Sequence, residues 1–548
     1  FFCFVCCGLC SSNSRCCYWT MRFERGPKNG IFLVLWSLTF GVLLPGAADA
    51  SSWRSKLGTF SRRCHHHPTS VQDKTLTLTS PLESIRDNHQ KMVFLRNIKV
   101  RGGGGSSSGN TSLKATSTKA ADSPSPGGSS SMVQSTFNLV NNVAGAGILA
   151  LSAGQAAGTG WVPACLICGV LGIISARTFV MVGEACELLQ ENDFKGLWSR
   201  TVSEKTSFVV DGMVALLCVC VNIIYSGILG DVSTFLLDQY GFPARLNNRI
   251  VNILVTTVTL LLPMSLIRDL SILSFTSILG FAAVMYTVLL IVGRAVDGSY
   301  KLGSGQFLAD GLLQVMPSFE KQSLWNVDFT SLILTSTLGL AYVSHYNAPI
   351  FYRQLENASA RRFGKLVNTS FAFLTILYIV TMGAGYSTFG ENCMGNILLN
   401  YHPKDMLATL GRVATWFSIL FGFPLVACGA REGLVGAAGS LGFPQLGLDK
   451  NNFALVFSIL AFVTLIACTV EDVSFVVNIT GALFGSFIVY ICPTILYVRA
   501  VEIAKGKGSK EHSAAKWNYA LVPFGIFIGG LGVFMTIREQ FSKGGAVA

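Results

Sequence analysis

Eleven long apolar runs follow one another between residues 132 and 537. A helix needs roughly 20 mostly apolar residues to cross the hydrocarbon core of a bilayer. Hydrophobic residues make up 51% of the chain and charged residues only 13%, against about 25% charged in a typical soluble domain. The chain is therefore predicted to be an all-α polytopic membrane protein. The runs lie approximately at 132–154, 161–183, 208–230, 250–267, 270–292, 328–352, 366–390, 407–430, 452–470, 474–498 and 519–537.

The basic residues predict the side of the membrane on which each loop lies, because cytoplasmic loops carry an excess of Lys and Arg. The formal net charge of +12 is therefore interpreted as topology and not as binding of nucleic acid. If the first run starts in the cytoplasm, the inside loops hold fifteen Lys and Arg residues and the outside segments hold eight. The segment before the first run is predicted to be cytoplasmic, and the C-terminus to lie on the opposite side.

The N-terminal region is predicted to lie outside the transport machinery. Residues 1–50 are expected to be an upstream artefact followed by a segment, starting at Met21, that has the parts of a secretory signal peptide. A cleaved signal, a mispredicted first exon and an uncleaved extra helix are the alternatives. Residues 51–131 have the low-complexity composition of a disordered tail, which would act as a tether or as a docking or phosphorylation region. Residues 132–537 form the predicted transmembrane domain, and 538–548 a short tail.

The first run, "STFNLVNNVAGAGILALSAGQAAGTG", carries residues that weaken a membrane helix. Gly145 and Gly147 lower helix stability, and Asn138, Asn141 and Asn142 need hydrogen-bonding partners inside the bilayer. Close helix packing through small residues would account for the glycines, but not for the asparagines. The alternative is a discontinuous helix whose free amides and carbonyls face a substrate cavity. In that case we expect Asn141 to be a ligand.

Other polar residues within the runs have two interpretations each. His345, in "AYVSHYNAPIFYRQLEN", precedes Pro349, which should break or kink the helix. The histidine would either form a structural hydrogen bond or carry a proton. Asn222 and Tyr225, three apart on the third run, would either face a central cavity or join helices.

Two arginines also fall within apolar runs, Arg177 in the second and Arg412 in the eighth. Both lie close enough to the ends of their runs to extend the guanidinium towards water. We expect structural roles for both residues.

Four segments resemble amino acid/auxin permeases, in particular the neutral amino acid transporters of animals and their vacuolar relatives in plants and fungi. The resemblance covers residues 132 to about 537 in order and does not extend to residues 1–131. It implies eleven spans in a LeuT-type 5+5 inverted repeat, with spans 1 and 6 broken at the midplane. The segments, from the first, sixth, eighth and tenth spans, are "STFNLVNNVAGAGILAL", "AYVSHYNAPIFYRQLEN", "LNYHPKDMLATLGRVATWFSILFGFPLVACGAREGL" and "DVSFVVNITGALFGSFIVYICPTILYVR".

The resemblance also implies an amino acid site between the two broken helices. Backbone amides at the break in span 1 would bind the carboxylate of the substrate, and carbonyls of span 6 would bind its ammonium. The side-chain pocket would involve spans 3, 6 and 8. The residues implied are Gly145, Ala146, Gly147 and Ile148 for the carboxylate, Ala341, Tyr342 and Ser344 for the ammonium, and Asn142, Asn222 and Tyr225 elsewhere in the site.

The coupling ion is where the sequence departs from the family. Asn141 matches a position that is a sodium ligand in sodium-coupled members, which also use a hydroxyl on span 8 just before a proline. Here the stretch before Pro424 reads "ILFGFP", and the nearest hydroxyls are Thr415 and Ser418. Proton coupling or exchange is therefore favoured over sodium, with Asn141, His345, Thr415 and Ser418 as candidate coupling residues. No other cofactor and no metal is expected.

The leading functional hypothesis is a secondary active transporter of small neutral amino acids, with the substrate and the lipid bilayer as its partners. A sodium-coupled symporter and an amino acid sensor that signals through its tail are the alternatives. An enzyme is not expected, because the runs contain no nucleophile-base pair, metal-ligand cluster or phosphate-binding loop. An internal membrane is slightly favoured over the plasma membrane, because no N-x-S/T site falls in a predicted outside loop. The sequence predicts no oligomeric state.

Overall fold

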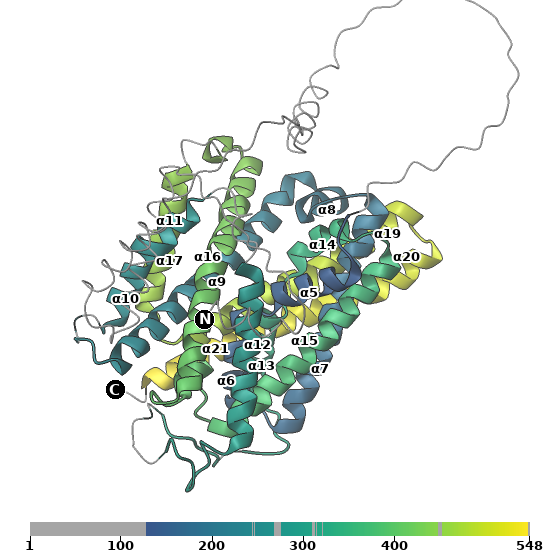
Figure 1. Cartoon of the computed structure of the whole chain (residues 1–548). Coiled ribbons are helices and arrows are strands. Elements are labelled where there is room, and N and C mark those ends of the chain that lie inside the picture. Colours follow the sequence, from purple (N-terminus) through teal and green to yellow (C-terminus); the bar gives the residue numbers. More distant parts are fainter. Residues whose placement is uncertain are drawn as a thin grey trace, which may run out of the picture. The chain divides into compact units, whose positions relative to one another are not determined.

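A computed structural model describes residues 128–545 except 244, 246, 268–275, 309–312, 314, 321 and 448–451. The signal-peptide-like segment and most of the predicted tail lie outside the described residues. The described part of the chain is built from helices (Figure 1). Extended pairing among these residues is limited to two isolated bridges, Ser130 with Leu355 and Ser318 with Gly390.

Eight helical segments of the described region are long and apolar enough to cross a membrane, and a bent pair makes a ninth. The prediction of an all-helical polytopic membrane protein is confirmed. The bent pair joins α5 (Met132–Val143) to η1 and α6 (Ala146–Ala150 and Leu151–Ala156) at an angle of 51°. The eight segments are Trp161–Leu189 (α7), Glu204–Gln239 (mostly α9), Ile278–Asp297 (within α12, Thr276–Asp297), Ala360–Phe389 (α15), Met406–Ser440 (α16), Asn452–Thr469 (α17), Val473–Lys505 (α18, η9 and α19) and Lys510–Ser542 (α20, η10 and most of α21).

The fourth and sixth predicted runs form shorter helices. The fourth run becomes α10 (Arg249–Thr256), η3 (Thr257–Leu261) and α11 (Leu262–Ser265). The sixth run becomes α13 (Ser331–Ala341), the turn η5 (His345–Asn347) and α14 (Ala348–Gln354). Within the described residues, each of the eleven predicted runs thus overlaps helix. Two of them are too short or too interrupted to count as spans by length and composition.

The two interruptions have local causes. At Gly145 the backbone is extended, with φ −93° and ψ −159°, so α5 ends at Val143 and a short 3₁₀ turn follows. In the sixth run, α13 ends at Ala341 and helix resumes at Ala348. Pro349 lies in the first turn of α14, where its missing N–H removes no helical hydrogen bond. The proline therefore starts the second half of this run after the break.

Glycines let neighbouring helices approach at the backbone. A Cβ on Gly485 would lie 2.8 Å from the carbonyl oxygen of Gly339, and a Cβ on Gly481 would overlap the carbonyl of Ser336. These contacts join α13 to η9, a π-helix over Gly481–Ile491. Elsewhere in the described part of the bundle α9 and α16 pack along each other, as do α7 and α15 (Figure 1). Close packing thus explains the Gly481-x-x-x-Gly485 pair.

Arg412 does not reach water, and the expectation that it would do so is wrong. The side chain is fully buried, and its guanidinium lies 3.9 Å from the centroid of the Phe235 ring. Its Nε donates to the carbonyl oxygen of Leu398 at 3.1 Å, and its Nη2 donates to that of Tyr401. The loop before α16 supplies these acceptors, so the charge is solvated by carbonyls. Arg177 is partly exposed, as predicted, and pairs with Glu184 at 3.1 Å.

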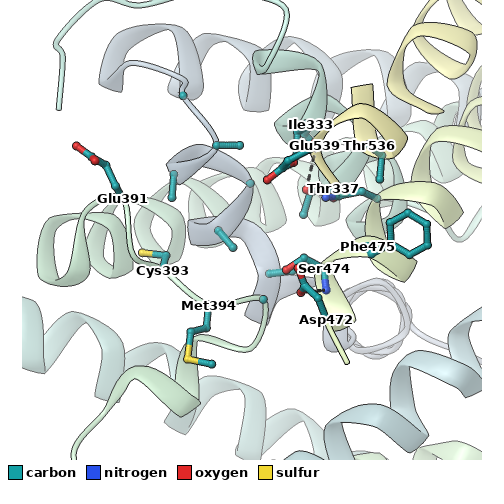
Figure 2. Close-up of a pocket in the computed structure, with 18 of the residues that line it drawn as sticks. Ile333, Thr337, Glu391, Cys393, Met394, Asp472, Ser474, Phe475, Thr536 and Glu539 are labelled. Atoms are coloured by element: carbon teal, nitrogen blue, oxygen red, sulfur yellow. Dashed lines mark hydrogen bonds between the residues drawn. The ribbon is translucent and has the colours of Figure 1, made fainter. Parts of the chain in front are cut away.

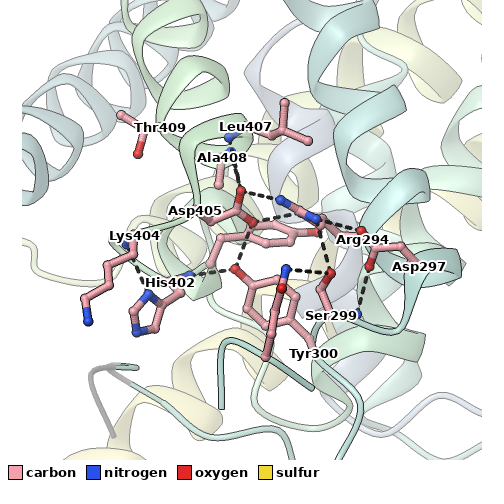
Figure 3. Close-up of polar contacts among 12 residues, drawn as sticks. Arg294, Asp297, Ser299, Tyr300, His402, Lys404, Asp405, Leu407, Ala408 and Thr409 are labelled. Atoms are coloured by element: carbon pink, nitrogen blue, oxygen red, sulfur yellow. Dashed lines mark hydrogen bonds and ion pairs between the residues drawn. The ribbon is translucent and has the colours of Figure 1, made fainter. Parts of the chain in front are cut away.

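An ion pair fixes that same loop to the end of α12 (Figure 3). Arg294 donates to both carboxylate oxygens of Asp405, at 2.8 and 2.6 Å, and Asp405 also caps α16. The hydroxyl of Tyr300 donates to Asp405 at 3.0 Å. Burial raises the pKa of Tyr300 above its usual range, so the hydroxyl keeps its proton and remains a donor.

Candidate functional site

A cavity of about 530 Å³ lies beside the break in the first span. Its wall comes from α5 and the break, from α9, α12 and α16, and from both halves of the sixth run. Six of the ten predicted substrate-binding residues line it. The lining includes Asn138, Asn141, Asn142, Gly145, Ala146, Gly147, Leu217, Val221, Tyr225, Ala341, Gln354, Ser418, Phe421, Gly422 and Leu425.

The break leaves free backbone donors on residues that line this cavity. The amide of Gly145 donates to the carbonyl of Val143 at 2.8 Å, and that of Ile148 donates to Gly145 at 3.3 Å. Within the described region, the amides of Ala146 and Gly147 donate no backbone hydrogen bond outside their 3₁₀ turn. Both residues line the cavity. Two adjacent free N–H groups at the start of a helical segment suit a carboxylate. Ile148 is buried and lines a smaller cavity next to the break.

The sixth run meets the break from the other side. Ala341 lines the cavity, and a Cβ on Gly147 would lie only 3.1 Å from its Cα. Tyr342 is buried and turns away, since its hydroxyl contacts the carbonyl of Cys168 and the hydroxyl of Thr375. The Ser344 hydroxyl, which is also buried, donates to Asn142.

Tyr378 on α15 joins the two breaks and was not predicted from the sequence. Its hydroxyl lies 2.8 Å from the carbonyl oxygen of Ala341 and 3.2 Å from that of Val143. A hydroxyl has one proton and can donate to only one of these oxygens at a time. The other carbonyl therefore keeps acceptor capacity next to the cavity. A tyrosine within an apolar run gives no signal of this role, because buried tyrosines are common in helical cores.

The predicted residues of the third span separate in the structure. Tyr225 lines the cavity, and its hydroxyl would lie 3.8 Å from a Cβ on Gly145. Asn222 is fully buried one turn away and lines neither this cavity nor the smaller one. A spacing of three residues places two side chains on neighbouring but distinct parts of a helix face.

The smaller cavity, of about 50 Å³, brings together the candidate coupling hydroxyls. Thr415 and Ser418 line it on α16, and Thr287 lines it on α12. The hydroxyls of Thr287 and Thr415 are 3.2 Å apart. Ala144, Gly145, Ala146 and Ile148 line it from the break. Thr287 was not predicted, because a single threonine in an apolar run gives no signal until the fold places it opposite Thr415. Asn141 lines the larger cavity instead.

His345 lies away from both cavities. It is fully buried, with Phe179 and Phe371 as aromatic neighbours at centroid distances of 5.2 and 6.3 Å. Its Nε2 is 3.0 Å from the carbonyl oxygen of Ser175 and 3.0 Å from the Thr178 hydroxyl. A carbonyl only accepts, so Nε2 carries the hydrogen. This placement favours the structural interpretation, in which His345 fixes the sixth run to α7.

A third cavity, of about 630 Å³, lies at the other end of the first span (Figure 2). Its wall includes residues within 150–158, the start of α18 (Val473–Thr480) and the end of α21 (Leu521–Gly545). Glu391 and Glu539 face it, and Thr337 donates to Asn478 at 2.7 Å inside its wall. The two large cavities therefore approach the break region from opposite ends.

Opened backbone on two broken helices that meet beside a cavity, inside a helical membrane protein, is the arrangement of secondary transporters. A sequence profile of the family described as transmembrane amino acid transporter protein matches residues 128–538. The chain belongs to this family. The resemblance to amino acid/auxin permeases is therefore confirmed.

Named relatives agree with this membership. The chain is 25% identical over 379 residues to the "Putative sodium-coupled neutral amino acid transporter 11" of Danio rerio, covering 68% of this chain and 80% of that protein. It is 24% identical over 300 residues to the vacuolar amino acid transporter 6 of Saccharomyces cerevisiae, covering 54% and 64%. The relatives are named transporters, so the prediction of a transporter and not an enzyme is confirmed.

The fold has a solved counterpart. The structure described as the inward facing conformation of Mhp1 matches with a TM-score of 0.51 at 12% identity, over 76% of this chain and 92% of that one. At this identity the likeness shows the fold alone, which is LeuT-like. The protein is thus a multi-pass integral membrane transporter with a LeuT-like helical fold.

Proposed function

We propose that this protein is a secondary active transporter of small neutral amino acids that works by alternating access. Eleven spans in a 5+5 inverted repeat would rock around the broken first and sixth helices. The observation that carries the proposal is the pair of free amides at Ala146 and Gly147, two residues that line a cavity beside the end of α13. The amides would bind the substrate carboxylate, and the carbonyls near Ala341 would bind its ammonium.

The preference for neutral substrates rests on the lining of the 530 Å³ cavity. None of the described residues that line it is Asp, Glu, Lys or Arg. A charged substrate side chain would therefore be desolvated there without a partner, which is costly. The part of the wall formed by α9 and α16 is mostly apolar. It includes Leu217 and Val221 on α9, and Phe421, Gly422 and Leu425 on α16.

The position of the cavity mouth supports an inward-open state. Asn138 and Gln354 lie at the mouth and are exposed. Both belong to the end of the bundle at which the first run begins and the sixth ends. The connection that follows, with Arg361, Arg362 and Lys365 at the start of α15, is one of the basic segments assigned to the cytoplasm.

Proton coupling is the proposal for the driving ion, because span 8 lacks a hydroxyl just before Pro424. Sodium coupling is the second candidate, and the small cavity favours it. Three hydroxyls, from Thr287, Thr415 and Ser418, line that cavity together with the backbone of the break. Oxygen atoms are the ligands that hard cations such as sodium prefer. If sodium is the coupling ion, Thr415→Val should lower sodium-driven uptake. If the proton is the coupling ion, the effect of Thr415→Val should not depend on sodium.

The decisive experiment measures uptake of labelled amino acids into proteoliposomes, with pH and sodium gradients imposed separately. We expect uptake of small neutral amino acids that a pH gradient accelerates. Acceleration by sodium alone would favour the second candidate. No flux for any of the twenty amino acids would overturn transport itself.

The sensor alternative rests on the place where the predicted tail joins the fold. The Ser130 amide donates to the carbonyl of Gln354 at 3.0 Å, and the Glu356 amide donates to that of Ser130 at 3.0 Å. Ser131 then caps α5. The tail therefore enters the fold next to Gln354, at the cavity mouth. Deleting residues 1–127 should leave flux unchanged in a pure transporter. An internal membrane remains our proposal for its location, tested by imaging a C-terminal fluorescent fusion.

A further inference from the structure

The connector between the tenth and eleventh predicted spans presents a basic surface next to the membrane. It runs from the end of α19 (Cys492–Lys505) through α20 (Lys510–Ala515) to η10 (Lys516–Ala520). The candidate spans Val473–Lys505 and Lys510–Ser542 meet in this connector, with only residues 506–509 between them. The ends of two membrane-crossing helices are expected near the lipid headgroups. We name Lys505, Lys507, Lys510 and Lys516 the connector lysines, and all four are exposed.

The connector is held in a defined shape. Ala515 packs against Val498 and Val501 in a small apolar cluster that joins α20 to α19, and the two lie together in Figure 1. His512 is buried, and its amide donates to the Ser509 hydroxyl at 3.1 Å. The connector lysines are therefore displayed on an ordered turn.

The charges of the connector are only partly compensated. Arg499 pairs with Glu502 at 2.7 Å and also donates to the carbonyl of Thr201 on α8 (Phe194–Thr201). Among the charged residues of 505–517, Glu511 is the acidic one, against four lysines. Basic clusters of this size next to a span attract anionic lipid headgroups.

Exposed aromatic and aliphatic side chains accompany the lysines. Trp517 is 84% exposed, Ile503 51% and Tyr519 37%. Tryptophan and tyrosine favour the boundary between headgroups and acyl chains. A free phosphate would use only the charges, whereas a lipid would use the charges and these apolar surfaces together.

We propose that the α19–α20 connector is a binding site for anionic phospholipid, with the connector lysines contacting the headgroup and Trp517 the acyl region. The lipid would fix the connector that joins the tenth span to the eleventh. This site is separate from the substrate cavity, and it depends on the protein's being a membrane protein and not on which amino acid it carries.

The test measures lipid binding to the full-length protein in neutral detergent by native mass spectrometry, with phosphatidylserine as the probe. The variant is K505Q/K507Q/K510Q/K516Q. The predicted topology places the connector lysines in an inside loop. The matched control is R245Q/K301Q/K404Q/R538Q, which neutralises four exposed charges of the predicted outside segments. Each basic residue near an anionic surface contributes about 1 kcal/mol, so we expect the connector variant to bind at least about tenfold more weakly.

The control should keep the affinity of the unmodified protein, and higher salt should weaken phosphatidylserine binding. Phosphatidylcholine and O-phosphoserine should bind weakly, because one lacks the net charge and the other the acyl chains. Equal phosphatidylserine affinity in the connector and control variants would overturn the proposal, as would equal binding of phosphatidylcholine. If the fourfold variant does not fold, K505Q/K507Q and K510Q/K516Q test the two halves separately.

Discussion

Asn142 on the first broken span accepts a hydrogen bond from Asn347 on the sixth run, with an Nδ2–Oδ1 distance of 3.2 Å. The same oxygen accepts from the Ser344 hydroxyl. One side chain thus ties α5 to the segment that leads into α14, next to the cavity. The bridge between Ser130 and Leu355 ties the same two elements at their other end. Joined at both ends, the two half-helices should move together.

Asn142→Ala should lower both stability and flux. The change leaves the buried Ser344 hydroxyl without its acceptor, which costs about 1–3 kcal/mol. It also removes one of the two links between the half-helices. Thermal unfolding and proteoliposome uptake would be compared with those of Gln134→Ala, on the exposed face of α5. Unchanged uptake and unfolding temperature in Asn142→Ala would show that the link is dispensable.

Gly147→Leu should abolish uptake while leaving folded protein in the membrane. Even the first added carbon would lie 3.1 Å from the Cα of Ala341, and the remaining atoms would enter the cavity at the free amides. The matched control is Gly169→Leu on α7, where a Cβ has nothing within 4 Å. Size-exclusion chromatography verifies folding of both. Uptake by Gly147→Leu at the level of the control would contradict the proposed carboxylate site.

Gly422→Val should shift selectivity towards smaller substrates. A Cβ at this position would make an ordinary contact with Tyr225, at 3.7 Å from its Cε2, so the valine fits but fills part of the cavity. We expect the ratio of alanine to leucine uptake to rise about tenfold, the usual effect of one or two methyl groups in an apolar pocket. Gly439→Val lies on the same helix with nothing within 4 Å and should leave the ratio unchanged. A similar change in both variants would place the substrate elsewhere.

His345→Gln should leave the pH dependence of uptake unchanged. The glutamine amide can replace Nε2–H as the donor to Ser175, so the link to α7 survives in part. Uptake across a pH series gives the profile, and we expect its shape to match that of the unmodified protein even if the maximum rate falls. A flattened profile would instead identify His345 as a proton carrier.

Asp405→Asn should destabilise the protein by roughly 3 kcal/mol, because it removes the buried carboxylate that pairs with the largely buried Arg294 guanidinium. Asp297→Asn removes the second carboxylate that pairs with Arg294. It should cost about 1 kcal/mol or less, because the Asp297 side chain is 40% exposed. Chemical unfolding in detergent would measure both. Equal losses of unfolding free energy in the two variants would mean that burial of Asp405 does not strengthen its ion pair with Arg294.

The sequence by itself determined the membrane class and the family, because both depend on local composition and order. Apolar runs of bilayer length predict spanning helices without any knowledge of their neighbours. Gly145 and Gly147 likewise predicted where the first helix is interrupted, because glycine weakens a helix wherever it lies.

Only the tertiary structure decided which polar groups meet at the break. Tyr378 and Thr287 reach the break from α15 and α12, far away in the sequence, and neither run contains a local signal of this. The structure also placed His345 against α7 and buried Arg412 among carbonyls of the preceding loop. The physical reason is that a polar side chain in a bilayer must find a partner. Its residue type and spacing state that need, whereas the packing of distant helices decides which partner meets it.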